Sequence, residues 1–148
     1  MGLTLKKGDV VFLDTSPFIY FFERHPTFFP YMEQLFNQVH EQEADIISSI
    51  VTFIEIATLP ARMGNQELVE QYRAYFTNSS RVRLLPVDQA IAEQAIALRA
   101  KYQLKTPDAI QLGTAIASQT NYVVTNDRQW KQLTNQTALT VEEIGLAE

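Results

Sequence analysis

Short apolar runs alternate with longer amphipathic segments along the chain, and this alternation limits the possible folds more than any other feature. The apolar runs predict strands at residues 10–13, 45–48, 81–86 and 122–125, with a short fifth strand at 139–141. Helical spacing predicts helices from Pro17 and over residues 28–40, 50–62, 67–77, 89–102 and 107–118. Ser16 and Thr106, each followed by a proline, are predicted as the N-caps of the first and last of these helices. Because parallel neighbouring strands need crossover connections, we expect a three-layer α/β/α sandwich around a mostly parallel sheet of four to five strands.

We expect residues 1–148 to form one domain, because no linker or repeat interrupts the pattern. The sequence has no long apolar run and no signal-peptide pattern, so we expect a soluble protein that is neither secreted nor bound to a membrane. The absence of cysteine excludes disulfides and thiolate zinc sites, and it permits a cytoplasmic location, which we predict.

The net charge is at first an objection to a nucleic-acid partner. With 12 basic and 17 acidic residues the formal charge is -5, whereas phosphate-binding proteins usually carry a basic surplus. If four of the acidic residues hold divalent cations, the formal charge of the remaining side chains is 12 minus 13, or -1. A nearly neutral charge on these side chains neither supports nor forbids RNA binding.

Four carboxylates are notable for their places in the predicted elements. Asp14 ends the first apolar run and Asp127 closely follows the fourth, so both are expected at the carboxyl edge of the sheet, where open parallel sheets bind ligands. Asp108 is expected at the same edge, in the first turn of a helix. Glu55 is flanked by apolar residues within a helix, and a carboxylate in such surroundings needs a partner, such as a cation.

Each acid alone has an ordinary structural explanation, as a strand end, a helix N-terminus, a satisfied buried group or a turn residue. Their joint occurrence at one edge favours a shared site. An all-oxygen donor set without cysteine or a histidine pair suits Mg²⁺ or Mn²⁺. Such a cation relieves repulsion between carboxylates, activates water and stabilises charge on a phosphate, so phosphodiester hydrolysis is the predicted chemistry.

Other polar side chains near this edge are candidates for supporting roles. The hydroxyls near enough in sequence to tune the site belong to Thr15, Ser16 and Thr125. The basic residues expected to contact substrate phosphates are Lys105, Arg128 and Lys131, with Arg62, Arg81 and Arg83 farther out. A solvated surface position is the simpler interpretation of any single one.

The run from Phe18 to Phe22 is too apolar for a helix with one exposed side. Core packing is the first explanation, and a groove for self-association or a partner protein is the second. Trp130 is expected to pack on the sheet, and the isolated His25 and His40 are expected at the surface.

Four segments of the chain together resemble the PIN-domain nucleases, and among these the VapC-type toxins of toxin–antitoxin pairs. The matching segments are Val11–Ser16, Ser49–Ile56, Lys105–Ala115 and Val124–Trp130. The resemblance covers nearly the whole chain and implies that the four acids hold Mg²⁺ or Mn²⁺ and cleave single-stranded or structured RNA. In this interpretation Asp14, Glu55 and Asp108 are the core ligands, and Asp127 completes or orients the site. The resemblance also implies a homodimer and a groove that takes a segment of an antitoxin protein.

Two alternatives share this resemblance: a PIN-like RNA- or protein-binding module that does not cleave, and an RNA-processing nuclease unrelated to toxicity. Two other α/β classes fit less well. A phosphoacceptor signalling domain needs an aspartate at the end of the third strand, where residues 81–87 offer none. A haloacid-dehalogenase-like phosphatase needs an aspartate two residues after Asp14, where Ser16 stands.

Overall fold

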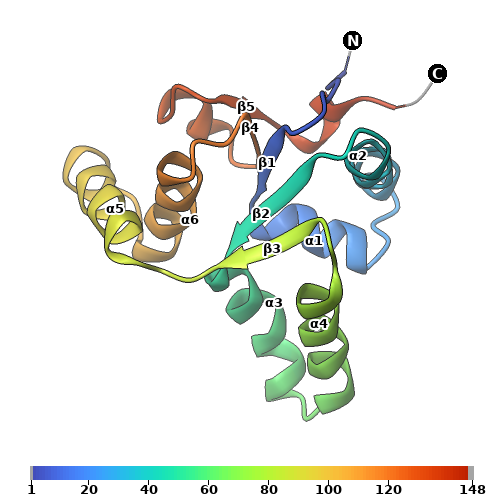
Figure 1. The fold of residues 1–148 in the computed structure, drawn as a ribbon. Coiled ribbons are helices and arrows are strands. Elements are labelled where there is room, and N and C mark those ends of the chain that lie inside the picture. Colours follow the sequence, from blue (N-terminus) through green and yellow to red (C-terminus); the bar gives the residue numbers. More distant parts are fainter. Residues whose placement is uncertain (1, 147–148) are drawn as a thin grey trace.

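Residues 2–146 are described by a computed structural model, in which a single five-stranded sheet lies between layers of helices (Figure 1). The strands are β1 (Val10–Leu13), β2 (Asp45–Ser49), β3 (Val82–Leu85), β4 (Tyr122–Val124) and β5 (Thr137–Leu139). Their order in the sheet is β3-β2-β1-β4-β5, and every neighbouring pair is parallel. The predicted α/β/α sandwich is confirmed.

The α-helices are α1 (Thr15–Phe22), α2 (Phe29–Glu41), α3 (Ile50–Arg62), α4 (Gln66–Asn78), α5 (Gln89–Lys101) and α6 (Thr106–Ala117). Two short 3₁₀ helices follow, η1 (Arg128–Gln132) and η2 (Val141–Ile144). The fifth strand lies two residues earlier in the chain than predicted, and it ends at Leu139 because Thr140 is the N-cap residue of η2. No helix within residues 2–146 is both long and apolar enough to cross a membrane.

Alternation of side chains along the strands divides the core between the two faces of the sheet. Val11 and Leu13 on β1 point into a cluster that includes Phe18 of α1 and residues of α2 and α4. Phe12 points the other way, into a cluster built with α5, α6 and the buried Trp130. Phe18 is fully buried, so core packing accounts for this part of the aromatic run, as predicted.

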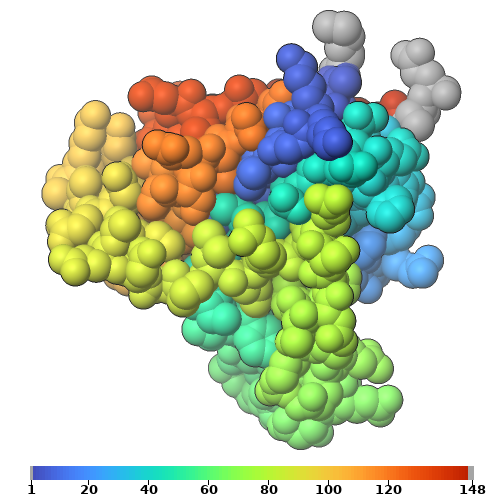
Figure 2. Space-filling view, viewed as in Figure 1, coloured from blue at the N-terminus to red at the C-terminus, as the bar shows by residue number. Residues whose placement is uncertain are grey.

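The α3–α4 hairpin extends beyond the ends of the strands and protrudes from the body of the molecule (Figures 1 and 2). One consequence is that α3 carries apolar side chains that the sheet does not cover. Ile54, Leu59 and Met63 are 57%, 58% and 75% exposed. The hairpin therefore presents an apolar surface beside the carboxyl edge of the sheet.

A charged contact anchors the C-terminal segment. Glu143 accepts hydrogen bonds from Lys131 Nζ and from the backbone N–H of Thr140, and these contacts lower the pKa of Glu143 to about 2. A carboxyl group whose pKa is lowered by folding stabilises the fold above its ordinary pKa near 4.5, and this stabilisation is lost as the pH falls toward 2.

We expect Glu143→Gln to lower the free energy of unfolding at pH 7 by less than about 1 kcal/mol, because both partners are about two-fifths exposed. Urea unfolding of both proteins at a series of pH values measures this. The difference should shrink as the pH falls below about 4.5, and a difference that does not change with pH would contradict the assignment.

Candidate active site

Asp14 stands where β1 ends and α1 begins. Its backbone N–H donates to Val124 O at 3.0 Å, which holds it beside β4. Its Oδ1 accepts from the Thr15 backbone N–H at 2.8 Å, so Asp14 is the N-cap of α1, and the prediction of Ser16 as the cap was wrong. Its Oδ2 accepts from the Thr125 hydroxyl at 2.9 Å. The pKa of Asp14 is raised to about 6, mainly by burial and to a smaller extent by the carboxylates of Asp108 and Glu55, while the hydrogen bonds from Thr15 and Thr125 lower it.

Asp108 lies in the first turn of α6, at the same edge of the sheet. Lys105 occupies the N-cap position of this helix, and Thr106, predicted as the cap, is the first helical residue. Burial raises the pKa of Asp108, and the negative charges of Glu55 and Asp127 raise it further, while Lys105 opposes them. These mutual effects mean that the carboxylates lie within electrostatic reach of one another, as expected from the order of strands and helices.

Asp127 follows β4 and begins η1. Its backbone N–H donates to the Thr125 hydroxyl oxygen at 3.0 Å, and its Oδ1 accepts from the Gln129 backbone N–H at 3.0 Å. The Thr125 hydroxyl therefore links two of the acids, because it also donates to Asp14. This side chain is almost fully buried, which holds the link in place.

Glu55 lies on α3, and the surroundings predicted for it were wrong. Glu55 and its apolar neighbour Ile54 are both exposed, because they lie on the protruding part of α3. It nevertheless has polar partners, as expected. Its Oε1 accepts from the Thr15 hydroxyl at 2.7 Å and from Gln111 Nε2 at 3.3 Å.

Gln111 is a residue that sequence reasoning missed. It is only 1% exposed and lies on α6, three residues after Asp108. Its Nε2 donates to the hydroxyls of Thr52 at 2.8 Å and Thr15 at 3.0 Å, and its contact with Glu55 is the longest of the three. Its Oε1 has no hydrogen-bond partner among the described residues. The signal was present: a lone glutamine among core residues of a helix needs partners, by the argument used for Glu55.

The direction of hydrogen bonds in this network follows from its two ends. Ser48 Oγ donates to the Leu13 carbonyl oxygen at 2.7 Å, so the Thr52 hydroxyl, 2.8 Å from Ser48 Oγ, donates to it and accepts from Gln111. At the other end, Thr15 donates to the Glu55 carboxylate and also accepts from Gln111. The amide of Gln111 is therefore the common donor that connects α6 to β1, β2, α1 and α3.

The donor set fits a hard divalent cation. The carboxyl groups that would hold it are those of Asp14, Glu55, Asp108 and Asp127, and none of them forms an ion pair within residues 2–146. Burial, and to a smaller extent repulsion between the carboxylates, raises the pKa values of Asp14 and Asp108, and a bound cation would offset both effects. In this part of the chain no three acidic or histidine side chains have the spacing of a closed metal site, so binding would require the carboxylates to draw closer.

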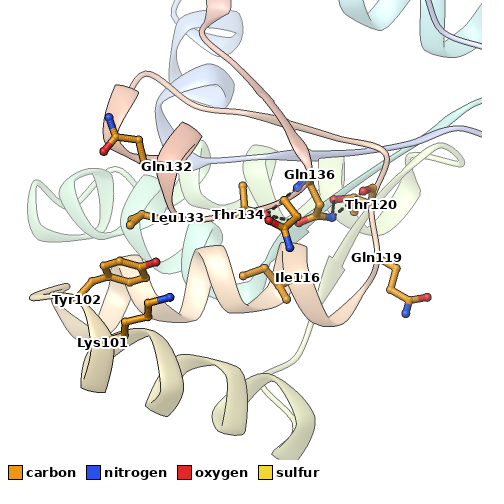
Figure 3. Close-up of a pocket in the computed structure, with 10 residues that line it drawn as sticks. Lys101, Tyr102, Ile116, Gln119, Thr120, Gln132, Leu133, Thr134 and Gln136 are labelled. Carbon is orange, nitrogen blue, oxygen red and sulfur yellow. Dashed lines mark hydrogen bonds between the residues drawn. The ribbon is translucent and has the colours of Figure 1, made fainter.

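The hydroxyls predicted beside the acids differ in what they contact. Thr15 and Thr125 donate to Glu55 and Asp14, whereas the Ser16 hydroxyl makes no hydrogen bond within residues 2–146. None of the four acids lines the cavity of about 700 Å³ in which Tyr102, Ile116 and Leu133 form part of a groove along α6 (Figure 3).

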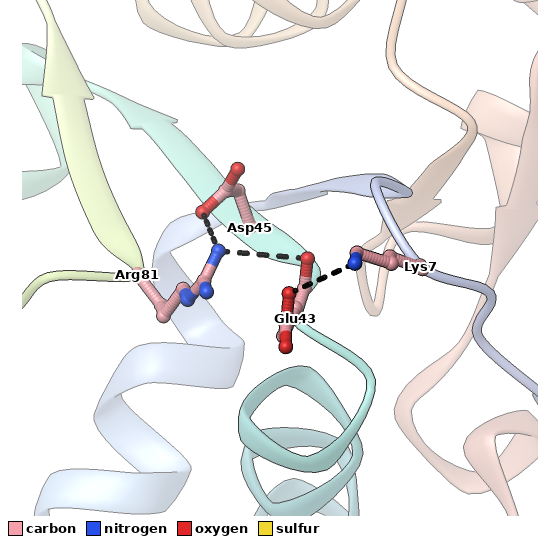
Figure 4. Close-up of polar contacts among 4 residues, drawn as sticks. All are labelled: Lys7, Glu43, Asp45 and Arg81. Atoms are coloured by element: carbon pink, nitrogen blue, oxygen red, sulfur yellow. Dashed lines mark hydrogen bonds and ion pairs between the residues drawn. The ribbon is translucent and has the colours of Figure 1, made fainter.

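The predicted basic residues also divide by position. Lys105 and Arg128 are exposed and close to Asp108 and Asp127 in the chain, but Lys131 pairs with Glu143. Arg81, one of the basic residues predicted to lie farther out, does not lie on the side of the acids. It precedes β3 and so lies at the opposite edge of the sheet, where it contacts Asp45 and the Glu43 carbonyl (Figure 4).

A family model for the PIN domain matches residues 11–135, which include all four acids. The chain therefore belongs to the PIN domain family, a family of nucleases. No curated protein sequence matches the chain significantly.

Solved structures with the same fold include three toxin–antitoxin complexes. VapBC2 from Rickettsia felis, bound to a promoter DNA fragment, has a TM-score of 0.68 and 17% identity, over 88% of this chain and 98% of that one. A toxin–antitoxin complex from Klebsiella pneumoniae has a TM-score of 0.64 and 22% identity, over 90% of this chain and 99% of that one. DNA-bound VapBC from Salmonella typhimurium has a TM-score of 0.66 and 19% identity, over 93% of this chain and 99% of that one.

Proposed function

We propose that this PIN domain is a Mg²⁺- or Mn²⁺-dependent endoribonuclease and the toxin of a type II toxin–antitoxin pair. The observation that carries the proposal is the gathering of Asp14, Glu55, Asp108 and Asp127 from four different elements at one edge of the sheet. Membership of a nuclease family supports the chemistry. The toxin–antitoxin complexes among the similar structures support the biological role.

In this mechanism the protein positions oxygen donors and a substrate phosphate. Thr125 orients the carboxylate of Asp14, and Thr15 with Gln111 orients that of Glu55. Lys105 and Arg128 are exposed cations beside the acids and would contact the phosphate backbone of RNA. A bound divalent cation would supply activation of the attacking water and stabilisation of the charge that develops on the phosphate.

We also propose a cytoplasmic location, a homodimer and an antitoxin partner. A cleft of about 400 Å³ lies between α1, α3 and α4, with Ile19, Leu59 and Tyr72 among its apolar lining residues and Glu55 at its border. An apolar antitoxin segment seated there would cover the exposed side chains of α3 and stand beside one of the proposed ligands. Such a partner would restrict access to the site.

Incubation of the purified protein with a mixed RNA pool tests the nuclease. We expect cleavage with Mg²⁺ or Mn²⁺, no cleavage with EDTA, and loss of cleavage in Asp108→Asn. Asp45→Asn is the matched control, because Asp45 lies at the opposite edge of the sheet beside Arg81 (Figure 4). Folded protein that binds the metal and RNA but cleaves nothing would instead indicate a binding module.

Expression in growing cells separates a toxin from an RNA-processing enzyme. A toxin should arrest growth, and the arrest should disappear with Asp14→Asn. Unaffected growth with an active nuclease would contradict the toxin role while leaving the chemistry intact.

A further inference from the structure

Acidic residues are scarce in one part of the sequence, which gives that part a net positive charge. Residues 94–141 contain five basic side chains and two acidic ones, Asp108 and Asp127, so their formal charge is 5 minus 2, or +3. The rest of the chain has 7 basic and 15 acidic residues, a formal charge of -8. Within the basic region, the only acids are therefore the two that belong to the proposed active site.

This basic region forms both walls of the groove of about 700 Å³ (Figure 3). One wall is the end of α5, with Lys101 and Tyr102, and the other is the segment from Gln132, the last residue of η1, to Gln136. The lining side chains include amides, hydroxyls, one aromatic ring and one ammonium group, and none of them is acidic. Polar groups of this kind suit hydrogen bonding to bases and sugars.

The groove is connected to the acids through the turn between α5 and α6. Tyr102 precedes Asp108 by six residues, and Leu133 follows Asp127 by six. On the other side of the same turn, Arg99 and Lys105 border a second cavity of about 510 Å³. Arg99 Nε donates to the Leu104 carbonyl at 3.1 Å, which fixes the shape of the turn. Lys105 is the N-cap residue of α6, and Asp108 lies in the first turn of the same helix.

Tyr102 and Lys101 form a unit that can bind one nucleotide. Lys101 Nζ lies 5.3 Å from the centre of the Tyr102 ring, so a base stacked on the ring would bring its phosphate close to an ammonium group. Lys101 is exposed and has no ion pair within residues 2–146. An aromatic ring with an adjacent free cation is the combination that binds single-stranded nucleic acid.

We propose that a single strand of RNA runs from the four acids past Lys105, over the α5–α6 turn, and into the groove between Tyr102 and Leu133. This inference rests on the proposed ribonuclease function and assigns the path of its substrate. The strand leaves the site on the face covered by α5 and α6, away from the apolar α3–α4 hairpin. Lys101 contacts a phosphate in this path, and Tyr102 stacks on a base.

Binding measured without cleavage tests the path. Fluorescence anisotropy of a labelled single-stranded RNA of mixed sequence, in EDTA, gives the Kd of each variant. We expect Lys101→Glu and Tyr102→Leu each to raise the Kd by roughly fivefold or more. Lys101→Glu should also reduce the slope of log K against log salt by about 0.7, the contribution of one phosphate contact to a single strand. Lys6→Glu is the matched control, because Lys6 is exposed and lies before β1, at the opposite edge of the sheet.

The outcomes separate the path from the nuclease function. Equal weakening by Lys101→Glu and Lys6→Glu, or no RNA binding by the unmutated protein, would overturn the path. With Mg²⁺ present, Lys101→Glu should raise KM for long RNA and leave kcat unchanged. Absence of cleavage by protein whose binding still depends on Lys101 and Tyr102 would overturn the nuclease and leave the path standing.

Discussion

Asp14→Asn is expected to lower metal-dependent RNA cleavage by on the order of 10²–10³-fold or more and, at the same time, to stabilise the metal-free protein. The loss of cleavage follows from removing a charge at the proposed metal site. The gain in stability follows from burial, which raises the pKa of Asp14 to about 6 and makes its charged form costly. A shift from 3.8 to about 6 corresponds to about 3 kcal/mol at most, and partial exposure of Asp14 makes about 1–3 kcal/mol the expected gain.

The dependence of this gain on pH has a defined sign. A carboxyl group with a raised pKa binds more protons in the folded state, so its charge destabilises the fold increasingly as the pH rises from about 3.8 through 6. The variant has no such charge. The difference in unfolding free energy between the two proteins should therefore be small at pH 4 and reach its full size above pH 6.

Urea unfolding in EDTA at several pH values measures the difference, and Asp45→Asn controls for the substitution itself. Added Mn²⁺ should stabilise the unmutated protein and leave Asp14→Asn nearly unaffected, because ligand binding stabilises only the form that binds it. An Asp14→Asn protein less stable than the unmutated one at pH 7 would show that the hydrogen bonds from Thr15 and Thr125 outweigh burial.

Gln111→Met is expected to weaken Mn²⁺ binding and RNA cleavage by roughly 10–100-fold, the usual effect of removing a group that orients a metal ligand. Methionine occupies a similar volume but cannot donate to Thr15, Thr52 or Glu55. The carboxylate of Glu55 would lose one direct contact, and Thr15, its other partner, would lose its anchor to α6. Gln111→Glu should be worse, because it places a further negative charge against Glu55.

Calorimetric titration gives the Kd for Mn²⁺, which reports how well the Glu55 carboxylate is positioned and does not depend on cleavage. Thr114→Val is the matched control, because Thr114 is a fully buried residue of the same helix whose hydroxyl bonds only to the Ile110 carbonyl. That substitution should leave the Kd for Mn²⁺ unchanged. If Gln111→Met lowers stability but binds Mn²⁺ as tightly as the unmutated protein, Gln111 has only a structural role.

The layered fold could be predicted from the sequence, because burial against the two faces of the sheet determines where apolar residues recur in the strands and in the helices. Strand ends were predicted well enough to place Asp14 and Asp127 at the correct edge. Helix caps were less predictable. Asp14 itself caps α1, and Lys105 precedes α6 without a side-chain cap, so the pairs Ser16–Pro17 and Thr106–Pro107 gave starts that were displaced by one or two residues.

The environment of Glu55 could not be predicted, because apolar neighbours in sequence indicate burial only when another layer covers them. The sheet ends before this part of α3, so Ile54 is exposed together with Glu55. Gln111 was missed for a different reason, because the sequence next to Asp108 does not indicate which groups the buried amide of Gln111 contacts. Its importance comes from contacts with Thr15 and Thr52, which lie far from it in sequence and meet it only after folding.

The four acids come from four elements spread over residues 14–127, and β1, the central strand, is completed on its far side only by β4. A ribosome synthesises this chain from Asp14 toward Asp127, so α1 to α6 and β1 to β4 are made before the last of the four acids exists. Asp14 also receives its hydrogen bond from Thr125, close to the end of that interval. A nascent chain therefore cannot assemble the proposed site until Asp127 has been synthesised, and a nuclease of the proposed kind would have its complete set of metal ligands only at that stage.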